Sequence, residues 1–517
     1  MIRSNALPRR LKQRLSALCL HTRFTRLLQA TALAALTGLA ACGGGGGGGS
    51  TSTANAGETT NQPAPTTPDT GSGSGSSSGS GSSSSTTGAT YVVGSSANLP
   101  TGATRVAQLT DVPWASLPVG SLVIVSAGTY AGPVTINAQG SASAPIVVRA
   151  ADSANLPVIT NSVDVQGAGW VQISGLSVRA PTWAGFVVRR GSHDIRISDS
   201  IVRNAPIGFD VSDGAGTGLV IANNLVEDTA TQGIGVSTNA VAGNPNIISG
   251  NTVRRSGQHG MEIRGNWWLI EHNSVSRSGL AVGGASGIHL WASSATDDAG
   301  DHNTIRYNLS FDNVDTLAHD GNGIQIDQWC DGNTVAWNMA WGNDGAGIII
   351  YDGNDNRVMG NTLRGNGLDS GGTHGGLGEL IIASSPALDR TSGNQVWNNI
   401  AVSTRSAVPA MWVDGRAWNN SNVLGPNWLH HTAGGTHLRW ADNANHNSAA
   451  AINSVTGTSG NLVEAPQFSN AAAPASGGWR LTTAPTLSGT AMVGDTDFGG
   501  TVGVAGMRWF GAYFSTP

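Results

Sequence analysis

The chain repeats a five-residue segment, Gly260-Met261-Glu262-Ile263-Arg264, at intervals of 23 to 36 residues. Each copy places two apolar residues after a glycine, with one variable residue between them and another after them. The other copies are Gly185-Phe186-Val187-Val188-Arg189, Gly208-Phe209-Asp210-Val211-Ser212, Gly233-Ile234-Gly235-Val236-Ser237, Gly287-Ile288-His289-Leu290-Trp291, Gly323-Ile324-Gln325-Ile326-Asp327 and Gly347-Ile348-Ile349-Ile350-Tyr351. Units of this length are too small to bury an apolar face alone, so the repeat predicts a solenoid of stacked units.

A second pattern, apolar-x-x-Asn-x-apolar, alternates with the first. Asparagine side chains in stacked turns can bond backbone groups and one another. Two short strands in each unit, with no helical stretch, predict an all-β, single-stranded parallel β-helix whose second and fourth segment positions fill the interior. The asparagine column consists of Ser200, Asn224, Asn251, Asn273, Asn308, Asn338, Asn361 and Asn399.

Both ends of the repeat region carry family motifs. The opening one runs from Gly120 through Gly128-Thr129-Tyr130 to Pro145-Ile146-Val147, and the closing one includes Pro466-Gln467-Phe468 and Gly511-Ala512-Tyr513. These segments resemble the pectate-lyase-like superfamily of extracellular β-helix proteins, which includes alginate- and chondroitin-cleaving lyases. The resemblance covers about residues 91–517 and implies a right-handed coil, which is also the general hand of parallel crossovers. It leaves the reaction open, because the fold carries lyases, hydrolases, epimerases and adhesins.

Composition divides the chain into three parts. Residues 1–41 are basic and then apolar, as in a signal peptide. The segment Leu39-Ala40-Ala41-Cys42 resembles a bacterial lipobox, which implies cleavage before Cys42, lipidation of its sulfur and, since Gly43 is not aspartate, anchoring in the outer membrane. Residues 42–90 are rich in Gly, Ser and Thr and are expected to form a disordered linker. Residues 91–517 are expected to form the β-helix domain, facing the periplasm or the cell surface. Within it, the Asn- and Gly-rich segment 403–460 is expected to interrupt the repeat with irregular turns and loops.

Charge and cysteine content exclude several functions. The leader holds seven of the 27 Lys and Arg residues and none of the 32 Asp and Glu residues, so the rest of the chain has a net charge of −12. Lys12 is the only lysine, which rules out a catalytic lysine after cleavage. An acidic, lysine-free domain is a poor nucleic-acid binder. Cys330 is the only cysteine beyond the lipobox, so the domain cannot form an internal disulfide.

Titratable residues gather at the outward positions in the middle of the repeat, whereas the flanking copies carry Gly, Ser, Val and Ile there. Stacked strands place equivalent residues about 4.8 Å apart. His289 is a candidate base oriented by Glu262, and Arg264 could neutralise a substrate carboxylate. Tyr351 is a candidate proton donor or acceptor, and Trp291 offers a flat face for a sugar ring. The predicted catalytic set is Glu262, Arg264, His289, Asp327 and Tyr351, with Trp291, Gln325, His319 and Asp320 as substrate-binding residues.

Two longer connections border the same copies of the repeat. Residues 293–301 contain Asp297, Asp298 and Asp301, whose oxygen ligands are a candidate Ca²⁺ site; a solvated acidic loop is the alternative. Residues 312–320 end in His319-Asp320, which resembles the His-Asp dipeptide of alginate lyases and epimerases of this fold. Insertions of this kind often wall a binding face. No cofactor other than Ca²⁺ is indicated.

Three functions fit these observations. The favoured one is a polysaccharide lyase that cleaves a uronate-containing glycan by β-elimination. A glycoside hydrolase would instead use a carboxylate pair among Asp210, Glu262 and Asp327. A non-catalytic, surface-tethered glycan-binding or structural rod fits the lipobox and linker equally well. In each case the expected partners are a polysaccharide and the outer membrane, and the chain is expected to be a monomer.

Overall fold

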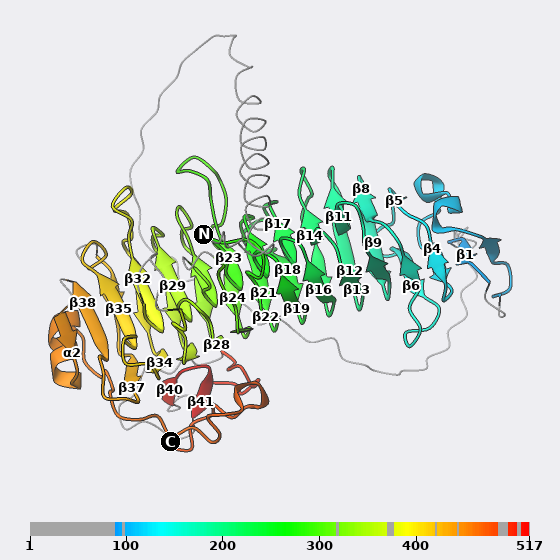
Figure 1. Cartoon of the computed structure of the whole chain (residues 1–517). Helices are drawn as coiled ribbons and strands as arrows, with labels where there is room; N and C mark the ends of the chain where they lie inside the picture. The colour runs from blue at the N-terminus through cyan, green and yellow to red at the C-terminus, as the bar shows by residue number, and fades with distance from the viewer. Residues whose placement is uncertain are drawn as a thin grey trace, which may run out of the picture. The chain divides into compact units, whose positions relative to one another are not determined.

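The computed structural model describes residues 88–95, 99–316, 320–369, 377–418, 421–441, 444–483, 495–503 and 508–515. Within residues 82–517 the chain coils through three long parallel sheets, to each of which successive turns contribute one strand (Figure 1). This is the parallel β-helix that the repeat predicts, built from a single chain, with the right-handed coil that the family resemblance implies. The first strand, β1 (Thr90–Val93), begins next to the expected start at Tyr91.

Sheets A, B and C are named here by their strands. Sheet A contains, in order, β2 (Thr104–Val106), β1, β3 (Leu122–Val125), β6 (Ile146–Ala150), β9 (Gly169–Ser174), β12 (His193–Ser198), β15 (Val220–Ala222), β18 (Asn246–Ser249), β21 (Trp268–Glu271), β24 (Thr304–Arg306), β27 (Thr334–Ala336), β30 (Arg357–Met359), β33 (Gln395–Trp397) and β36 (Val423–Leu424). Sheet B contains β4 (Thr129–Tyr130), β7 (Val158–Ile159), β10 (Ser177–Arg179), β13 (Ile201–Arg203), β16 (Leu225–Thr229), β19 (Thr252–Ser256), β22 (Ser274–Ser276), β25 (Leu309–Phe311), β28 (Met339–Trp341), β31 (Thr362–Arg364), β34 (Ile400–Ser403) and β37 (Trp428–His431).

Sheet C holds the repeated glycine segments. Its strands are β5 (Val134–Ile136), β8 (Val163–Gln166), β11 (Ala184–Arg189), β14 (Ile207–Val211), β17 (Ile234–Val236), β20 (Met261–Ile263), β23 (Ile288–Leu290), β26 (Ile324–Ile326), β29 (Ile348–Tyr351), β32 (Leu380–Ala383), β35 (Met411–Asp414), β38 (Leu438–Ala441) and the antiparallel β39 (Ala444–His446).

The predicted register of sheet C is confirmed. Met261, Ile288, Ile324 and Ile348 are consecutive Cα partners, and all four side chains are buried. Strand alternation therefore sends Glu262, His289 and Gln325 to the other side of the sheet. One apolar core cluster runs inside the coil from Val93 to Ile452.

The predicted asparagine column forms a continuous ladder between sheets A and B. The side chain of Asn308 accepts from the backbone N–H of Asn273 at 2.9 Å and donates to Asn338 at 3.0 Å, as its neighbours do in turn. A left-handed residue precedes each ladder position, for example His272, Tyr307 and Trp337 with φ of 55°, 57° and 55°. Such φ values are unfavourable for aromatic residues, so the repeated bonds of the ladder hold these bends in place.

The expectation that residues 403–460 interrupt the repeat is wrong in its first half. Strands β35, β36, β37 and β38 continue all three sheets to Ala441, because Asn427 and Asn461 extend the ladder: Asn399 N donates to Asn427 Oδ1 and Asn427 N to Asn461 Oδ1. Among the described residues the single α-helix, α2 (Ala449–Thr456), follows and buries Ile452 in the core.

Short elements complete the fold. The hairpin of β40 (Arg508–Phe510) and β41 (Tyr513–Ser515) packs on sheet B, where Ala512 N donates to Thr362 Oγ1 at 2.9 Å. No helix in the described parts of the chain is long and apolar enough to cross a membrane. The 3₁₀ turns are η1 (Leu109–Asp111), η2 (Trp114–Ser116) and η3 (Pro474–Ser476).

Candidate functional site

The outward face of sheet C carries a row of polar side chains across three neighbouring strands. Glu262 on β20, His289 on β23 and Gln325 on β26 are Cα partners. The row ends at Ile349 on β29, which is buried in a small apolar cluster with Ala346 and Ile381. The structure therefore brings together the central residues of the predicted catalytic set and closes the row on one side with apolar side chains.

His289 is the buried centre of this row. Its Nε2 lies 3.1 Å from Asp327 Oδ2, and the whole residue is only 6% exposed although it points away from the coil. Its other ring nitrogen, Nδ1, is buried and has no hydrogen-bond partner. Burial lowers the pKa of His289, but Asp327, Glu262 and Asp320 raise it more, so the pKa lies above its ordinary value.

His259, which sequence analysis missed, stacks on His289 with ring centroids 4.2 Å apart and an interplanar angle of 10°. The backbone N–H of Ser286 donates to His259 Nδ1 at 3.2 Å. Burial, together with the neighbouring His289, holds the pKa of His259 well below its ordinary value. His259 is therefore neutral and carries its proton on Nε2, since Nδ1 accepts a hydrogen bond.

A third column of the repeat would have revealed His259. The residues just before the repeat glycines are polar only in the middle of the repeat. Each of these polar residues contacts the row. Gln232 Nε2 donates to Glu262 Oε2 at 2.8 Å, and Ser286 Oγ donates to Gln325 Oε1 at 2.6 Å. This column reads Ala184, Ile207, Gln232, His259, Ser286, Asn322 and Ala346.

Gln325 has a supporting place in the site. It is only 3% exposed, its Oε1 accepts from Ser286 and Asn322, and its Nε2 donates to Asp320 Oδ1 at 3.3 Å. With both ends of its amide engaged, Gln325 fixes its neighbours rather than offering a free group to a sugar. Asp320 is tied to the same network, and His319 lies outside the described residues.

Arg264 lies at the edge of the row. Its Nη2 donates to Asp297 Oδ2 at 3.0 Å, and its guanidinium carbon is 4.6 Å from the centre of the Trp291 ring. The backbone and side chain of Ser293 also donate to Asp297, and these bonds, with Arg264, lower the pKa of its carboxyl. Arg264 is thus oriented by Trp291 and Asp297, and about a third of its side chain stays exposed.

The three acidic residues of the 293–301 connection do not form a shared set of ligands. Asp297 pairs with Arg264, Asp298 accepts from Asn266 Nδ2 at 2.6 Å, and Asp301 accepts from the backbone N–H of Asp331 at 2.6 Å. Burial raises the pKa of Asp301 to about 6. Each carboxylate has its own protein donors, which is not the arrangement expected for the candidate Ca²⁺ site.

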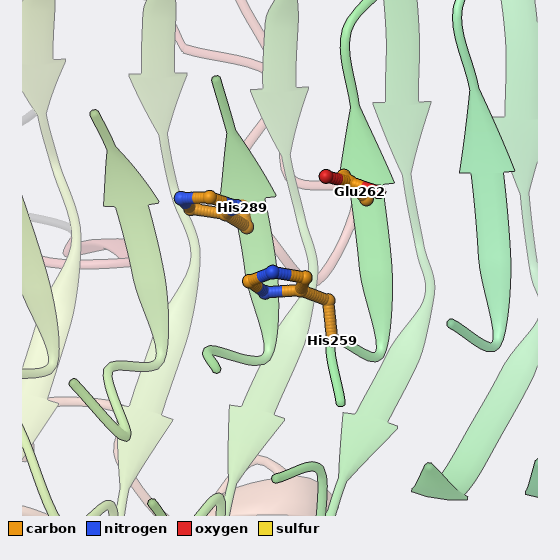
Figure 2. Close-up of side chains that lie close together, drawn as sticks. All are labelled: His259, Glu262 and His289. Carbon is orange, nitrogen blue, oxygen red and sulfur yellow. The ribbon is translucent and has the colours of Figure 1, made fainter. Parts of the chain in front are cut away.

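Among the described residues, only His259, Glu262 and His289 bring three candidate metal-binding atoms within 4.8 Å of one another (Figure 2). The donor orbitals of imidazole lie in the ring plane, and two nearly parallel rings 4.2 Å apart direct them side by side rather than at one point. His259 Nδ1 is also occupied by the Ser286 N–H. In this arrangement the three residues do not suit a metal ion.

Tyr351 closes the opposite edge of the site from Arg264. It is half-buried at the end of β29, and burial, followed by the charges of Asp352 and Asp327, raises the pKa of its hydroxyl to about 12. Tyr351 therefore stays protonated at neutral pH and can serve as a proton donor.

Comparison with known proteins places the chain among the right-handed parallel β-helix proteins. Residues 149–266 match the family model described as "Right handed beta helix region", and residues 299–435 match "Periplasmic copper-binding protein (NosD)". His259, Glu262 and His289 all lie outside the second of these segments. No curated protein matches the sequence.

Several solved structures are similar to this chain at low identity. The A-module of the mannuronan C-5 epimerase AlgE4 from Azotobacter vinelandii is 13% identical, with a TM-score of 0.41 over 67% of this chain and 89% of that one. An alginate lyase from Paenibacillus sp. str. FPU-7 is 15% identical, with a TM-score of 0.40 over 57% and 98%. The GH136 lacto-N-biosidase from Eubacterium ramulus is 15% identical, with a TM-score of 0.43 over 73% and 68%.

Proposed function

We propose that this protein is a polysaccharide-active enzyme that cleaves a uronate-containing glycan by β-elimination. The observation that carries the proposal is the linked row on sheet C, in which His289 is bonded to Asp327 and flanked by Glu262, with Tyr351 on the next strand. Perturbed titratable groups that converge on one face are characteristic of active sites. The similar structures that act on polysaccharides add support only for the fold.

In the proposed reaction the C5–H bond and the bond from C4 to the leaving oxygen break, and a C4=C5 double bond forms. Glu262 and Asp327 both lie beside His289 and are more exposed than it is. His289, the buried centre, accepts the proton. Tyr351 donates a proton to the leaving oxygen. Arg264, held over Trp291, faces the substrate carboxylate and offsets the negative charge that develops during proton removal.

A panel of polysaccharides, assayed with and without chelator, tests this proposal. A lyase releases products that absorb in the ultraviolet through their new double bond, and Tyr351→Phe should abolish that signal. New reducing ends without this absorbance would instead identify a glycoside hydrolase. That second candidate is favoured by the presence of carboxylates on both sides of His289, since glycoside hydrolysis uses a carboxylate pair. Binding without any turnover would leave a non-catalytic rod.

We further propose that the chain is an exported lipoprotein anchored through Cys42 in the outer membrane. The support is the lipobox-like Leu39-Ala40-Ala41-Cys42 and the match of residues 299–435 to a family described as periplasmic. The linker expected for residues 42–90 lies almost wholly outside the described residues, which begin at Gly88. A monomeric β-helix held in this way meets its polysaccharide at a membrane surface.

A further inference from the structure

A hollow lies on the outward face of sheet C, nearer the N-terminus than the candidate site. Its volume is about 380 Å³, and strands β8, β11 and β14 form its floor. Trp183 and Asn161 border it, and Asp164, Arg189, Asp210 and Ser212 project into it. The proposed reaction uses none of these residues.

Trp183 is the feature that makes this hollow suitable for a ligand. The residue is 58% exposed, the largest value among the exposed large apolar residues described. The indole Nε1 donates to Asp210 Oδ2 at 3.0 Å, which fixes the ring beside the floor of the hollow. A tryptophan held in the open by a hydrogen bond presents a flat apolar face beside polar groups, a combination suited to stacking on a sugar ring.

The charges of the hollow favour a neutral ligand. Asp164 is neutralised by Arg189 through two hydrogen bonds of 3.0 and 2.5 Å, and Asp213 is 3.5 Å from Arg190. Asp210 forms no ion pair within the described part of the chain, and although its charge also interacts with Arg189, the aspartates outnumber the arginine among the lining residues, so the hollow keeps a net negative charge. A sugar hydroxyl can donate to the Asp210 carboxylate, whereas a uronate placed beside it would be repelled.

The hollow and the candidate site belong to one continuous face. Asp210 on β14 is the Cα partner of Gly235 on β17, and Gly235 is the partner of Glu262 on β20. Two strand spacings, about 10 Å, therefore separate Asp210 from Glu262. The outward position between them is Gly235, and the side chain of Gln232 lies beside it and donates to Glu262 at 2.8 Å, so Gln232 connects the two regions of this face.

We propose that this hollow is a subsite for a neutral sugar unit, stacked on Trp183 and hydrogen-bonded to Asp210. The inference rests on the proposed function. The substrate is then a glycan in which uronates, bound near Arg264, are interspersed with neutral sugars, and it is not a polyuronate alone. This substrate class also suits a chain whose net charge beyond the leader is −12, because the glycan carries less negative charge per unit of length.

Calorimetric titration of the full chain measures this preference directly. The mixed glycans are fragments of hyaluronan and gellan, and the uronate-only glycans are fragments of alginate and polygalacturonate of equal length, all in the same salt. We expect the wild type to bind a mixed glycan more tightly than either polyuronate. Trp183→Ala should weaken that binding by about tenfold through loss of the stacking face. Asp210→Asn should bind polyuronates more tightly than the wild type does, because the negative charge that repels them is removed. The difference in affinity between mixed glycans and polyuronates should therefore become smaller.

The control is Val423→Ala, which truncates an exposed apolar residue on β36 of sheet A and should leave all four affinities unchanged. The subsite is refuted by unchanged binding of mixed glycans to Trp183→Ala, by tighter binding of a polyuronate to the wild type, or by binding of none of the four. A Trp183-dependent affinity without any cleavage would retain the subsite and refute the lyase. Cleavage that is unchanged by Trp183→Ala would retain the lyase and refute the subsite.

Discussion

Asp327 governs the charge of His289, because it is bonded to His289 Nε2 and its charge favours the imidazolium. His289 must be neutral to accept a proton, so activity should rise with pH through a pKa above about 6.5, the ordinary value for histidine. In Asp327→Asn the imidazolium loses its partner, and the acid limb of kcat/KM should move to lower pH. The check is a pair of pH–rate profiles; a limb that stays in place would show that another group controls the rate.

His289 also contributes to stability, which its outward position alone does not predict. Its folded-state pKa is raised, so protonation stabilises the fold; this contribution is complete below about pH 6.5 and is lost as the pH rises through the folded-state pKa. We expect His289→Ala to abolish activity and to lower the midpoint of urea unfolding more in acidic than in alkaline buffer. Arg357→Ala, at an exposed position of β30, is the control and should change neither.

The asparagine ladder is the device that joins the elements. The side chain of Asn338 donates to the carbonyls of Ile305 and Ala336 and to Asn361, and it accepts from Asn308. Every one of these groups is buried, and a buried polar group without a partner costs about 1–3 kcal/mol. The ladder thus fixes the bend between sheets A and B in each turn.

Asn338→Ala leaves several of these groups without partners at once. We expect a loss of about 3 kcal/mol or more in the free energy of unfolding, measured by urea denaturation followed by circular dichroism. Asn224→Ser is the milder comparison, because Ser200 already occupies this column in the preceding turn, where its Oγ accepts from Leu176 N. Equal stability of Asn338→Ala and the wild type would mean that the ladder accompanies the bend without maintaining it.

At the scale of the molecule, the arrangement follows from strand stacking. Residues that are 27 or 36 positions apart in the sequence, such as Glu262, His289 and Gln325, become neighbours because each turn of the coil returns to sheet C. The connection 279–286 meets the next long connection, where Gly284 N donates to Asp315 at 3.1 Å. Long connections therefore occur in the same turns that carry the titratable residues.

Anchoring of the whole molecule is tested through Cys42. Cys42→Ser removes the sulfur that the lipobox would lipidate, so the protein should leave the membrane fraction and its N-terminus should lack the mass of a lipid. Fractionation and mass spectrometry of the processed chain are the measurements. Cys330→Ser serves as the control, because Cys330 is buried in the core and should not affect fractionation. If Cys42→Ser remained in the membrane fraction to the same extent as the wild type, the proposal that the protein is a lipoprotein would be refuted.

The sequence by itself determined the coil, because its two periodic patterns follow from strand alternation and turn geometry. Ile324 and its partners inside sheet C, the asparagine column, and the outward row of Glu262, His289 and Gln325 were all predictable in this way. The repeat pattern did not predict the strands in residues 403–460, because the spacing of the pattern changes there. The asparagine ladder nevertheless continues and supports these strands.

Only the tertiary structure decided how those outward residues are used. Strand alternation predicts whether a side chain points into or out of the coil. Its burial, however, also depends on the connections between strands, whose conformations do not follow the repeat. His289 proved to be buried against His259 and bonded to Asp327, Gln325 proved to be fully engaged, and the three aspartates of 293–301 proved to have separate partners. Trp183 likewise meets Asp210 through contacts between different turns, 27 residues apart, which no local pattern encodes.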